Sequence, residues 1–158
     1  MALAVLISAC SVDSRPSAPE IVIVTWPGQP TLDEYRDGAS AWIPLGFDVV
    51  EQSDLPECER HWYETGDTDC VITIGIRRDP LLRDREGTNA LSNRADRSVT
   101  IDASLSGYDL IVAVAHEVGH IVLDTAEHTR GGVMGGASAQ LEAVDYELAC
   151  RAIHICAE

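Results

Sequence analysis

The sequence predicts an α+β fold in which helices pack against a mixed β-sheet. Short segments rich in β-branched residues recur through the first two thirds of the chain, whereas residues 107–123 form one apolar segment that is too long for a strand. A second segment with helical spacing closes the chain after the glycine-rich residues 131–136. The length of 158 residues fits one domain, and the hydrophobic share of 46% excludes wholesale disorder.

The expected fold begins with a strand and a helix. Residues 21–26 (IVIVTW) have the composition of a buried strand, which ends at the Pro-Gly pair of residues 27–28. Residues 31–42 predict a helix, since Thr31 followed by Glu34 three residues later matches a capping box. Four apolar side chains fall on one face of that helix: Leu32, Tyr35, Ala39 and Trp42.

The middle of the chain predicts more strands, and its last third predicts two helices. Three further segments with the character of strands are residues 46–51, 70–77 and 98–103. The polar residues 52–69 and the charged residues 78–97 are expected to be loops, the second with a short edge strand around residues 89–92. Residues 107–123 predict a buried helix, and residues 138–155 predict a closing helix.

Charge and lysine content exclude several classes of protein. The chain has 26 Asp and Glu against 11 basic residues, all of them Arg, which gives a net charge of -15. So acidic a chain is not expected to bind nucleic acid, and it would not bind anionic lipid by charge. Because the chain contains no lysine, Schiff-base, P-loop and Ser-Lys mechanisms are excluded as well.

The first 20 residues have the features of an export signal and a tether. Residues 1–10 (MALAVLISAC) form a short apolar run with small residues before Cys10, which resembles a bacterial lipobox. That resemblance implies a signal peptide and lipidation of Cys10, whereas an N-terminal strand is the alternative. Residues 11–20 are typical of a tether, so residues 21–158 would form the folded domain. We therefore expect an exported lipoprotein of the cell envelope, attached to the membrane only through the lipid on Cys10.

The five cysteines divide into one candidate lipid anchor and four others. An even set of cysteines in an exported chain favours two disulfides. Of the three possible connectivities, we favour the one that closes two short loops, with the pairs Cys58–Cys70 and Cys150–Cys156. Free buried thiols remain the alternative. No CxxC spacing occurs, so a zinc site made of cysteines is not expected.

Residues 116–120 (His-Glu-Val-Gly-His) carry the most informative chemistry of the sequence. Residues four apart lie on the same face of a helix, so His116 and His120 can bind one zinc ion. Glu117 lies beside the first ligand and would act as general base toward a zinc-activated water. These are the only strongly polar side chains in the apolar part of the expected helix, and a metal would give them a partner there.

The stretch from His116 to Gly136 resembles the metzincin clan of zinc metallopeptidases. The motif of that clan is H-E-x-x-H-x-x-G-x-x-H, followed by a turn with a methionine beneath the metal, the Met-turn. The resemblance implies His128 as the third ligand and Met134 as the methionine of the turn. It also implies a fold with a mixed sheet, an active-site helix, the Met-turn and a C-terminal helix.

The match to the metzincin motif departs at two positions. Leu123 stands where the family has a glycine, and His128 lies two residues beyond the family's third histidine, a position that Ala126 occupies. A surface loop two residues longer would accommodate this difference. The alternative is an acidic third ligand, for which the sequence offers Asp124, Glu127, Glu142 (with Asp145 nearby) and Glu147.

These motifs together predict a zinc-dependent endopeptidase that acts as a monomer on a peptide or protein substrate. The substrate would lie extended along an edge strand of the sheet, with residues 89–92 as the candidate strand. One Zn²⁺ is the expected cofactor. Two alternatives remain open: an exported zinc-binding surface module on a zincin scaffold that cleaves nothing, and a metal-free structural lipoprotein in which the motif is accidental.

Overall fold

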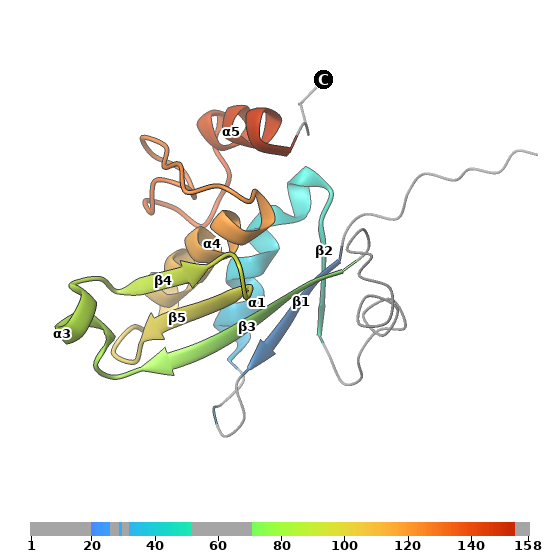
Figure 1. Ribbon diagram of the computed structural model, residues 1–158. Helices are drawn as coiled ribbons and strands as arrows, with labels where there is room; N and C mark the ends of the chain where they lie inside the picture. The colour runs from blue at the N-terminus through green and yellow to red at the C-terminus, as the bar shows by residue number, and fades with distance from the viewer. Residues whose placement is uncertain (1–19, 26–28, 30–31, 52–70, 154–158) are drawn as a thin grey trace, which may run out of the picture.

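The structure of the protein is a computed structural model that describes residues 20–25, 29, 32–51 and 71–153 (Figure 1). These residues form a mixed α+β fold, as the sequence predicts. The elements in chain order are β1 (Glu20–Thr25), α1 (Asp33–Ala39), the 3-10 helix η1 (Ser40–Leu45), β2 (Asp48–Glu51), β3 (Val71–Asp79), α3 (Leu82–Glu86), β4 (Ala90–Asn93), β5 (Ser98–Asp102), α4 (Gly107–Val122) and α5 (Ala143–Ile153). In this part of the chain, none of the helices has the length and apolar character that a membrane span requires.

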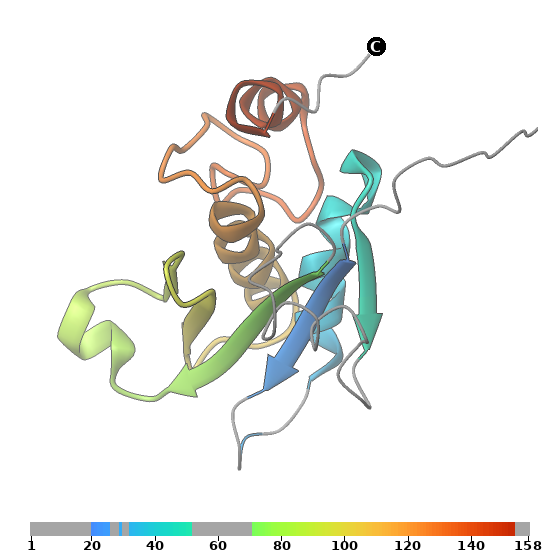
Figure 2. The same ribbon diagram turned by 45° about the vertical axis from the view of Figure 1, so that its right-hand side comes forward.

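One mixed five-stranded sheet, in the order β2-β1-β3-β5-β4, forms the framework of the fold. Strands β1, β2, β3 and β5 run parallel, whereas β4 runs antiparallel to β5 and lies at an edge. The expected edge strand around residues 89–92 is therefore confirmed, with the bounds Ala90–Asn93. Helices α1 and α4 lie against the same side of the sheet, and α5 lies beyond the loops that follow α4 (Figures 1 and 2).

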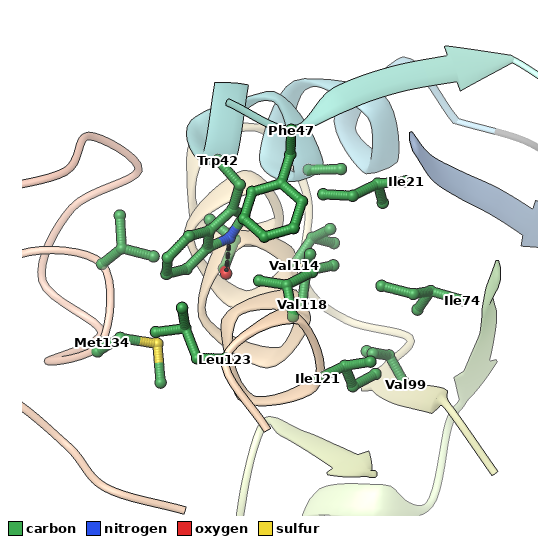
Figure 3. Packing of buried hydrophobic residues seen from close by; sticks show 14 of the residues in the cluster. Ile21, Trp42, Phe47, Ile74, Val99, Val114, Val118, Ile121, Leu123 and Met134 are labelled. Carbon is green, nitrogen blue, oxygen red and sulfur yellow. Dashed lines mark hydrogen bonds between the residues drawn. The ribbon is translucent and has the colours of Figure 1, made fainter. Parts of the chain in front are cut away.

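Trp42, on η1, anchors the first helical segment to α4 in the core. Its ring is fully buried, and its indole N–H donates a hydrogen bond to the main-chain oxygen of Ala115 on α4 (2.9 Å; Figure 3). Gly38 allows α1 to approach α4 closely, since a Cβ there would lie 2.7 Å from the side chain of Val114. The strands complete the core with side chains that include Ile21, Ile74 and Val99. This packing fixes α4, which carries the motif of residues 116–120, against the sheet.

The first helix begins and ends differently from the prediction. The predicted N-cap at Thr31 is wrong, because α1 begins at Asp33 and its N-cap is Leu32, which makes no side-chain capping bond. The acidic Asp33 and Glu34 in the first turn favour this start through the helix dipole. The chain then continues as η1, which contains Pro44, rather than as an α-helix, in which the proline ring would clash with the carbonyl of Ser40 four residues earlier.

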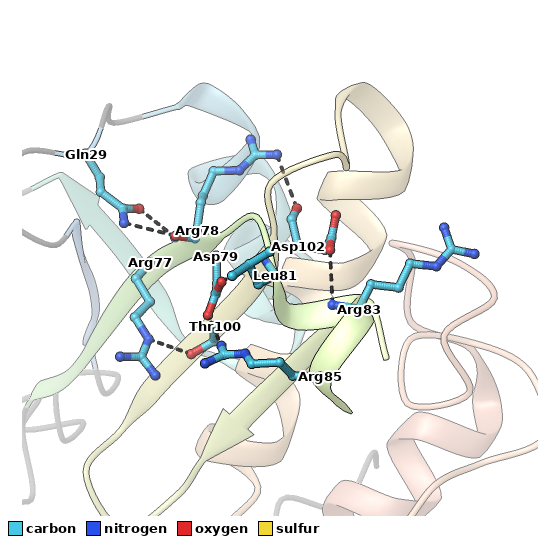
Figure 4. A network of polar contacts seen from close by, with 9 residues as sticks. All are labelled: Gln29, Arg77, Arg78, Asp79, Leu81, Arg83, Arg85, Thr100 and Asp102. Carbon is cyan, nitrogen blue, oxygen red and sulfur yellow. Dashed lines mark hydrogen bonds and ion pairs between the residues drawn. The ribbon is translucent and has the colours of Figure 1, made fainter. Parts of the chain in front are cut away.

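Residues 82–86 form helix α3, where the sequence predicts only a charged loop. A helix of five residues is too short to show a periodic apolar pattern. The carboxylate of Asp102, at the end of β5, accepts a hydrogen bond from the backbone N–H of Arg83 (3.2 Å; Figure 4). Asp79 likewise accepts a hydrogen bond from the N–H of Leu81 (2.9 Å). The start of α3 therefore depends partly on a distant residue, which the local sequence does not reveal.

Arg78 and Asp102 hold the connection from β5 to α4. The guanidinium of Arg78 donates hydrogen bonds to the main-chain oxygens of Ala103 (2.7 Å) and Leu105. The carboxylate of Asp102 accepts hydrogen bonds from the hydroxyl and the N–H of Ser104, and these bonds lower the pKa of Asp102 below its ordinary value. The connection is thereby fixed, and with it the place where α4 begins.

The closing helix α5 begins at Ala143, five residues later than the predicted start at Ser138. In the loop before it, the hydroxyl of Ser138 accepts a hydrogen bond from the N–H of Gln140 (2.9 Å). The carboxylate of Asp145 accepts another from the N–H of Glu142 (2.8 Å). Side-chain oxygens therefore replace helical carbonyls as acceptors here, which delays the helix. The predicted end of the helix lies outside the described residues.

Most residues of the predicted lipid anchor and disulfides lie outside the described part of the chain. These are the signal segment and most of the tether, residues 1–19, together with Cys10, Cys58, Cys70 and Cys156. Cys150 is the one cysteine of the set that lies within the described residues, on α5. The pairs Cys58–Cys70 and Cys150–Cys156 and the lipid on Cys10 stay predictions.

Candidate metal centre

Helix α4 brings His116 and His120 side by side. Their spacing of four residues places both imidazoles on one face of the helix, with ring centroids 4.7 Å apart. The two Nε2 atoms are 3.1 Å apart. Two nitrogens bound at about 2.0–2.1 Å to one tetrahedral zinc ion would lie about 3.3 Å from each other. The pair is therefore spaced as two ligands of one metal ion would be.

His128 joins this pair from the loop after α4. Its ring centroid lies 5.1 Å from that of His116 and 4.8 Å from that of His120. One candidate ligand atom from each histidine lies within 4.8 Å of the other two. Among the residues that the structure describes, this is the cluster of His, Cys, Asp and Glu side chains that could hold a metal ion. The structure thus brings together the three histidines that the sequence predicts as ligands.

The acidic rivals to His128 take no part in this cluster. Asp124 and Glu127 instead form surface ion pairs with arginines, at 3.2 and 3.3 Å respectively. Glu142 and Glu147 are exposed at the end of the loop before α5 and on α5 itself. The geometry therefore favours a third histidine over a carboxylate.

The loop between His120 and His128 turns at Asp124 rather than at a glycine. Leu123, at the position of the family's glycine, remains in a helical conformation as the C-cap of α4 and is buried. Asp124 follows with a φ of 43°, a left-handed conformation that Asp tolerates better than most residues. The turn is displaced by one residue relative to the metzincin motif, and the longer loop allows His128 to reach the other two histidines.

A main-chain oxygen orients the ring of each helical histidine. Nδ1 of His116 lies 2.9 Å from the oxygen of Val133, and Nδ1 of His120 lies 2.8 Å from the oxygen of Thr125. A carbonyl oxygen can only accept, so each Nδ1 carries the hydrogen. In the neutral imidazoles, both Nε2 atoms then present lone pairs to each other across 3.1 Å. This contact is repulsive unless a metal ion or a proton lies between the two nitrogens.

His120 is held in the uncharged form that a metal ion requires. The residue is 8% exposed, and its burial lowers the pKa of His120 to about 4. The hydrogen bond to Thr125 opposes this shift, whereas the nearby His116, His128 and Arg94 add to it. His120 is therefore neutral near pH 7, and a neutral imidazole can bind a metal ion without first losing a proton.

Glu117 lies between two hollows that flank the three histidines. The first, of about 700 Å³, extends along α4 toward its N-terminus, and the second, of about 340 Å³, extends over His120 and His128. The residues that line both hollows are Thr88, Ala90, His116 and Glu117. The two hollows adjoin at these residues, and we call them together the groove between β4 and α4; Glu117, which is 7% exposed, lies at its wall beside the histidines.

Met134 packs against α4 on the side of the Trp42 ring. Its side chain is fully buried, and its sulfur lies so near Gly119 that a Cβ at that position would overlap it (Figure 3). Residues 131–136, which we call the Met134 turn, also include Val133, whose oxygen orients the His116 ring. The predicted methionine turn therefore lies in direct contact with the helix of the site.

Sequence reasoning missed the part that Asp145 plays beside the site. This aspartate on α5 is fully buried and accepts hydrogen bonds from the N–H groups of Val133 and Met134, both at 3.0 Å. An aspartate near the start of a helix is common and carries no motif, so the sequence contains no signal for this contact.

No protein-family model matches the sequence, and no curated protein matches it. Functional assignment therefore depends on the geometry of the three histidines and Glu117 and on the chemistry that these side chains support.

Proposed function

We propose that this protein is a zinc-dependent endopeptidase with a metzincin-like fold. The observation that carries the proposal is the pair of Nε2 atoms of His116 and His120, whose lone pairs face each other at 3.1 Å with His128 close by. A cation between these nitrogens would turn a repulsive contact into ligand bonds. The order of mixed sheet, apolar helix, methionine turn and closing helix supports the metzincin-like interpretation.

The donor set fits zinc. Imidazole suits zinc, whereas calcium and magnesium prefer oxygen ligands. Three protein ligands, rather than the four of a structural zinc site, leave a position open for water or substrate. A zinc ion held by His116, His120 and His128 would polarise a peptide carbonyl and lower the pKa of a water molecule.

Glu117 would carry out the proton transfers. It follows the first ligand in the sequence, lines the groove on both sides of the histidines and is largely shielded from solvent. Its carboxylate would accept a proton from the attacking water and then donate that proton to the amine that leaves when the peptide bond breaks. One side chain can serve both steps because it returns to the carboxylate form at the end.

The groove between β4 and α4 would hold the substrate in an extended conformation. Strand β4 pairs with β5 on one side and forms the edge of the sheet on the other. A peptide could add to this edge by β-augmentation. Ala90 lines both hollows, and Leu91 and Ser92 line the one over His120. A peptide paired with β4 would therefore pass along the wall that contains Glu117.

The proposal includes a place of action outside the cytoplasm. Residues 1–10 resemble a lipobox, so Cys10 would carry the lipid that holds the domain at the cell envelope. Disulfides among the remaining cysteines would suit an exported chain. The substrate would then be a peptide or protein of the envelope or its surroundings, cleaved by a monomer.

The first test is the metal content and activity of the wild-type protein. We expect one zinc per chain after purification without added metal, and cleavage of casein or of a peptide library that stops when a chelator removes the zinc. One zinc per chain with no cleavage across a broad library would favour the non-proteolytic zinc-binding module instead. Failure to bind zinc, even when it is added, would reject both.

His128→Ala is expected to weaken zinc binding while leaving the fold intact. The residue is exposed on a loop, and its loss removes one of three candidate ligands. Zinc affinity, measured by competition with a chromophoric chelator, should fall by more than the roughly 10–100-fold typical of an outer-shell substitution. Glu127→Gln, the matched control, removes a nearby carboxylate outside the cluster and should keep the wild-type affinity. Wild-type affinity in His128→Ala would assign the third ligand to another residue.

A further inference from the structure

Asp145 is a fully buried carboxylate that binds the backbone of the Met134 turn. Its Oδ2 accepts hydrogen bonds from the N–H groups of Val133 (3.0 Å) and Glu142 (2.8 Å). Its Oδ1 accepts hydrogen bonds from the N–H of Met134 (3.0 Å) and the hydroxyl of Thr129 (3.3 Å). The three N–H groups donate to the side chain, and a carboxylate, with two acceptor oxygens, can satisfy all of them, whereas the single hydrogen of the Thr129 hydroxyl is shared with the nearer oxygen of Gly131 (2.7 Å).

One peptide group connects Asp145 to the candidate metal centre. The peptide group between Val133 and Met134 donates its N–H to Oδ1 of Asp145, and its carbonyl oxygen accepts the hydrogen of Nδ1 of His116 (2.9 Å). Hydrogen bonds at the two ends of one peptide group polarise each other, so a negative charge at the N–H makes the carbonyl oxygen a stronger acceptor. A stronger acceptor at Nδ1–H in turn makes Nε2 a better metal ligand.

We propose that Asp145 is a positioning residue of the metal centre, which acts on His116 through the peptide group between Val133 and Met134. It fixes the carbonyl that orients the His116 ring, and its charge increases the basicity of Nε2. This inference rests on the metal site of the proposed function but not on peptide hydrolysis. Metal binding alone can therefore test it, whatever the outcome of the cleavage assays.

Gly132 allows the Met134 turn to approach Asp145 this closely. Its φ is 63°, and a Cβ there would overlap Oδ2 of Asp145 and lie 2.8 Å from Cγ. The side chain of Asp145 therefore has little room to change its size or position. Asp145→Asn is the suitable substitution, because it keeps the shape of the side chain and changes only its hydrogen bonding. Whichever oxygen becomes the NH₂ group, either Val133 or Met134 loses the acceptor for its N–H.

His120 provides an internal reference on the same helix. Its Nδ1 is bound to the oxygen of Thr125, in the loop after α4, and not to the Met134 turn. A change transmitted through the peptide group of Val133 and Met134 should therefore alter His116 and spare His120. A general loosening of the site should alter both.

The test compares Asp145→Asn with the wild-type chain, each loaded with cobalt(II), and measures zinc affinity in parallel. Each histidine bound to cobalt(II) through Nε2 gives a paramagnetically shifted, exchangeable proton resonance from its Nδ1–H. We expect the His116 resonance to shift or to exchange faster, the His120 resonance to stay unchanged, and zinc affinity to fall about 10–100-fold. The matched control is Glu147→Gln, an exposed carboxylate on the same helix, which should match the wild type in both measurements.

Thr129→Val is a milder second variant in case the Asn variant does not fold. It removes the hydroxyl that contacts Oδ1 of Asp145 and the oxygen of Gly131 (2.7 Å), and it leaves the backbone donors in place. It should move the His116 resonance in the same direction by a smaller amount. A folded Asn variant with wild-type resonances and affinity would overturn the proposal. Equal changes at both histidines, or a His116 resonance that Thr129→Val leaves unchanged, would overturn it as well.

Discussion

Glu117→Gln is expected to lower the kcat of peptide hydrolysis by about 10²–10⁴-fold, the range typical of losing a general acid-base group. The amide has nearly the size of the carboxylate but cannot take a proton from water. The zinc content should stay at the wild-type value, because Glu117 is not part of the histidine cluster. The measurements are steady-state kinetics on a peptide that the wild-type protein cleaves and elemental analysis of both proteins.

Glu117→Asp tests whether the position of the carboxylate matters as well as its charge. The shorter residue keeps a carboxylate but withdraws it by one methylene, so we expect an activity between those of the wild type and the Gln variant. A loss that depends on position as well as charge is what a proton-transfer group would show. If the Gln variant binds one zinc and cleaves as fast as the wild type, Glu117 has no part in the mechanism.

The helix of the site could be predicted because its signals are local. Residues 107–123 are apolar over a length that only a helix explains, and α4 spans Gly107–Val122. The proximity of His116 and His120 follows from helix geometry once that helix is assigned. The edge strand β4 was also predictable, because its four residues (ALSN) carry no charge and so differ from the charged segment around them.

The position of His128, the candidate third ligand, shows where the family motif no longer predicts the structure. The family pattern places a turning glycine at the position of Leu123, but this chain continues as helix there and turns at Asp124. Backbone conformation at a single residue depends on the packing of the loop as well as on residue type. The sequence could therefore propose His128 through resemblance, whereas its distance from the other histidines had to come from the structure.

Contacts between distant residues account for what the sequence did not predict. Helix α3 is held in part by Asp102, which follows it by more than a dozen residues and belongs to another element. Asp145 binds the Met134 turn from the next helix and delays the start of that helix through the N–H of Glu142. Neither aspartate differs in residue type or spacing from an ordinary turn or surface aspartate, so only tertiary structure shows what each one does.

Gly119→Ala is expected to destabilise the fold and weaken the metal site together. Gly119 faces Trp42 and Met134 from α4, and a Cβ there would lie 2.9 Å from Cη2 of Trp42 and overlap the sulfur of Met134. Neither neighbour can withdraw easily. The indole of Trp42 is bound to the oxygen of Ala115 (2.9 Å), and the N–H of Met134 is bound to Asp145 (3.0 Å).

Two opposing effects decide the size of this change. Alanine is favoured over glycine inside a helix by about 1 kcal/mol. Overpacking a filled core costs about 1–3 kcal/mol, occasionally more, and two restrained neighbours place this site at the upper end. We therefore expect a net loss of about 2 kcal/mol in the free energy of unfolding. In a domain of this size, thermal denaturation should then show a Tm lowered by roughly 4–8 °C.

Gly107→Ala is the matched control, since it makes the same substitution on the same helix. Its φ is 53° and nothing lies within 4 Å of the added Cβ, so it should cost about 1 kcal/mol in backbone strain and leave zinc affinity unchanged. In Gly119→Ala, displacement of Met134 would move the adjacent Val133 oxygen that orients His116, so zinc affinity should fall together with the Tm. A raised Tm in Gly119→Ala would mean that helix propensity outweighs the contact and that Trp42 and Met134 yield readily.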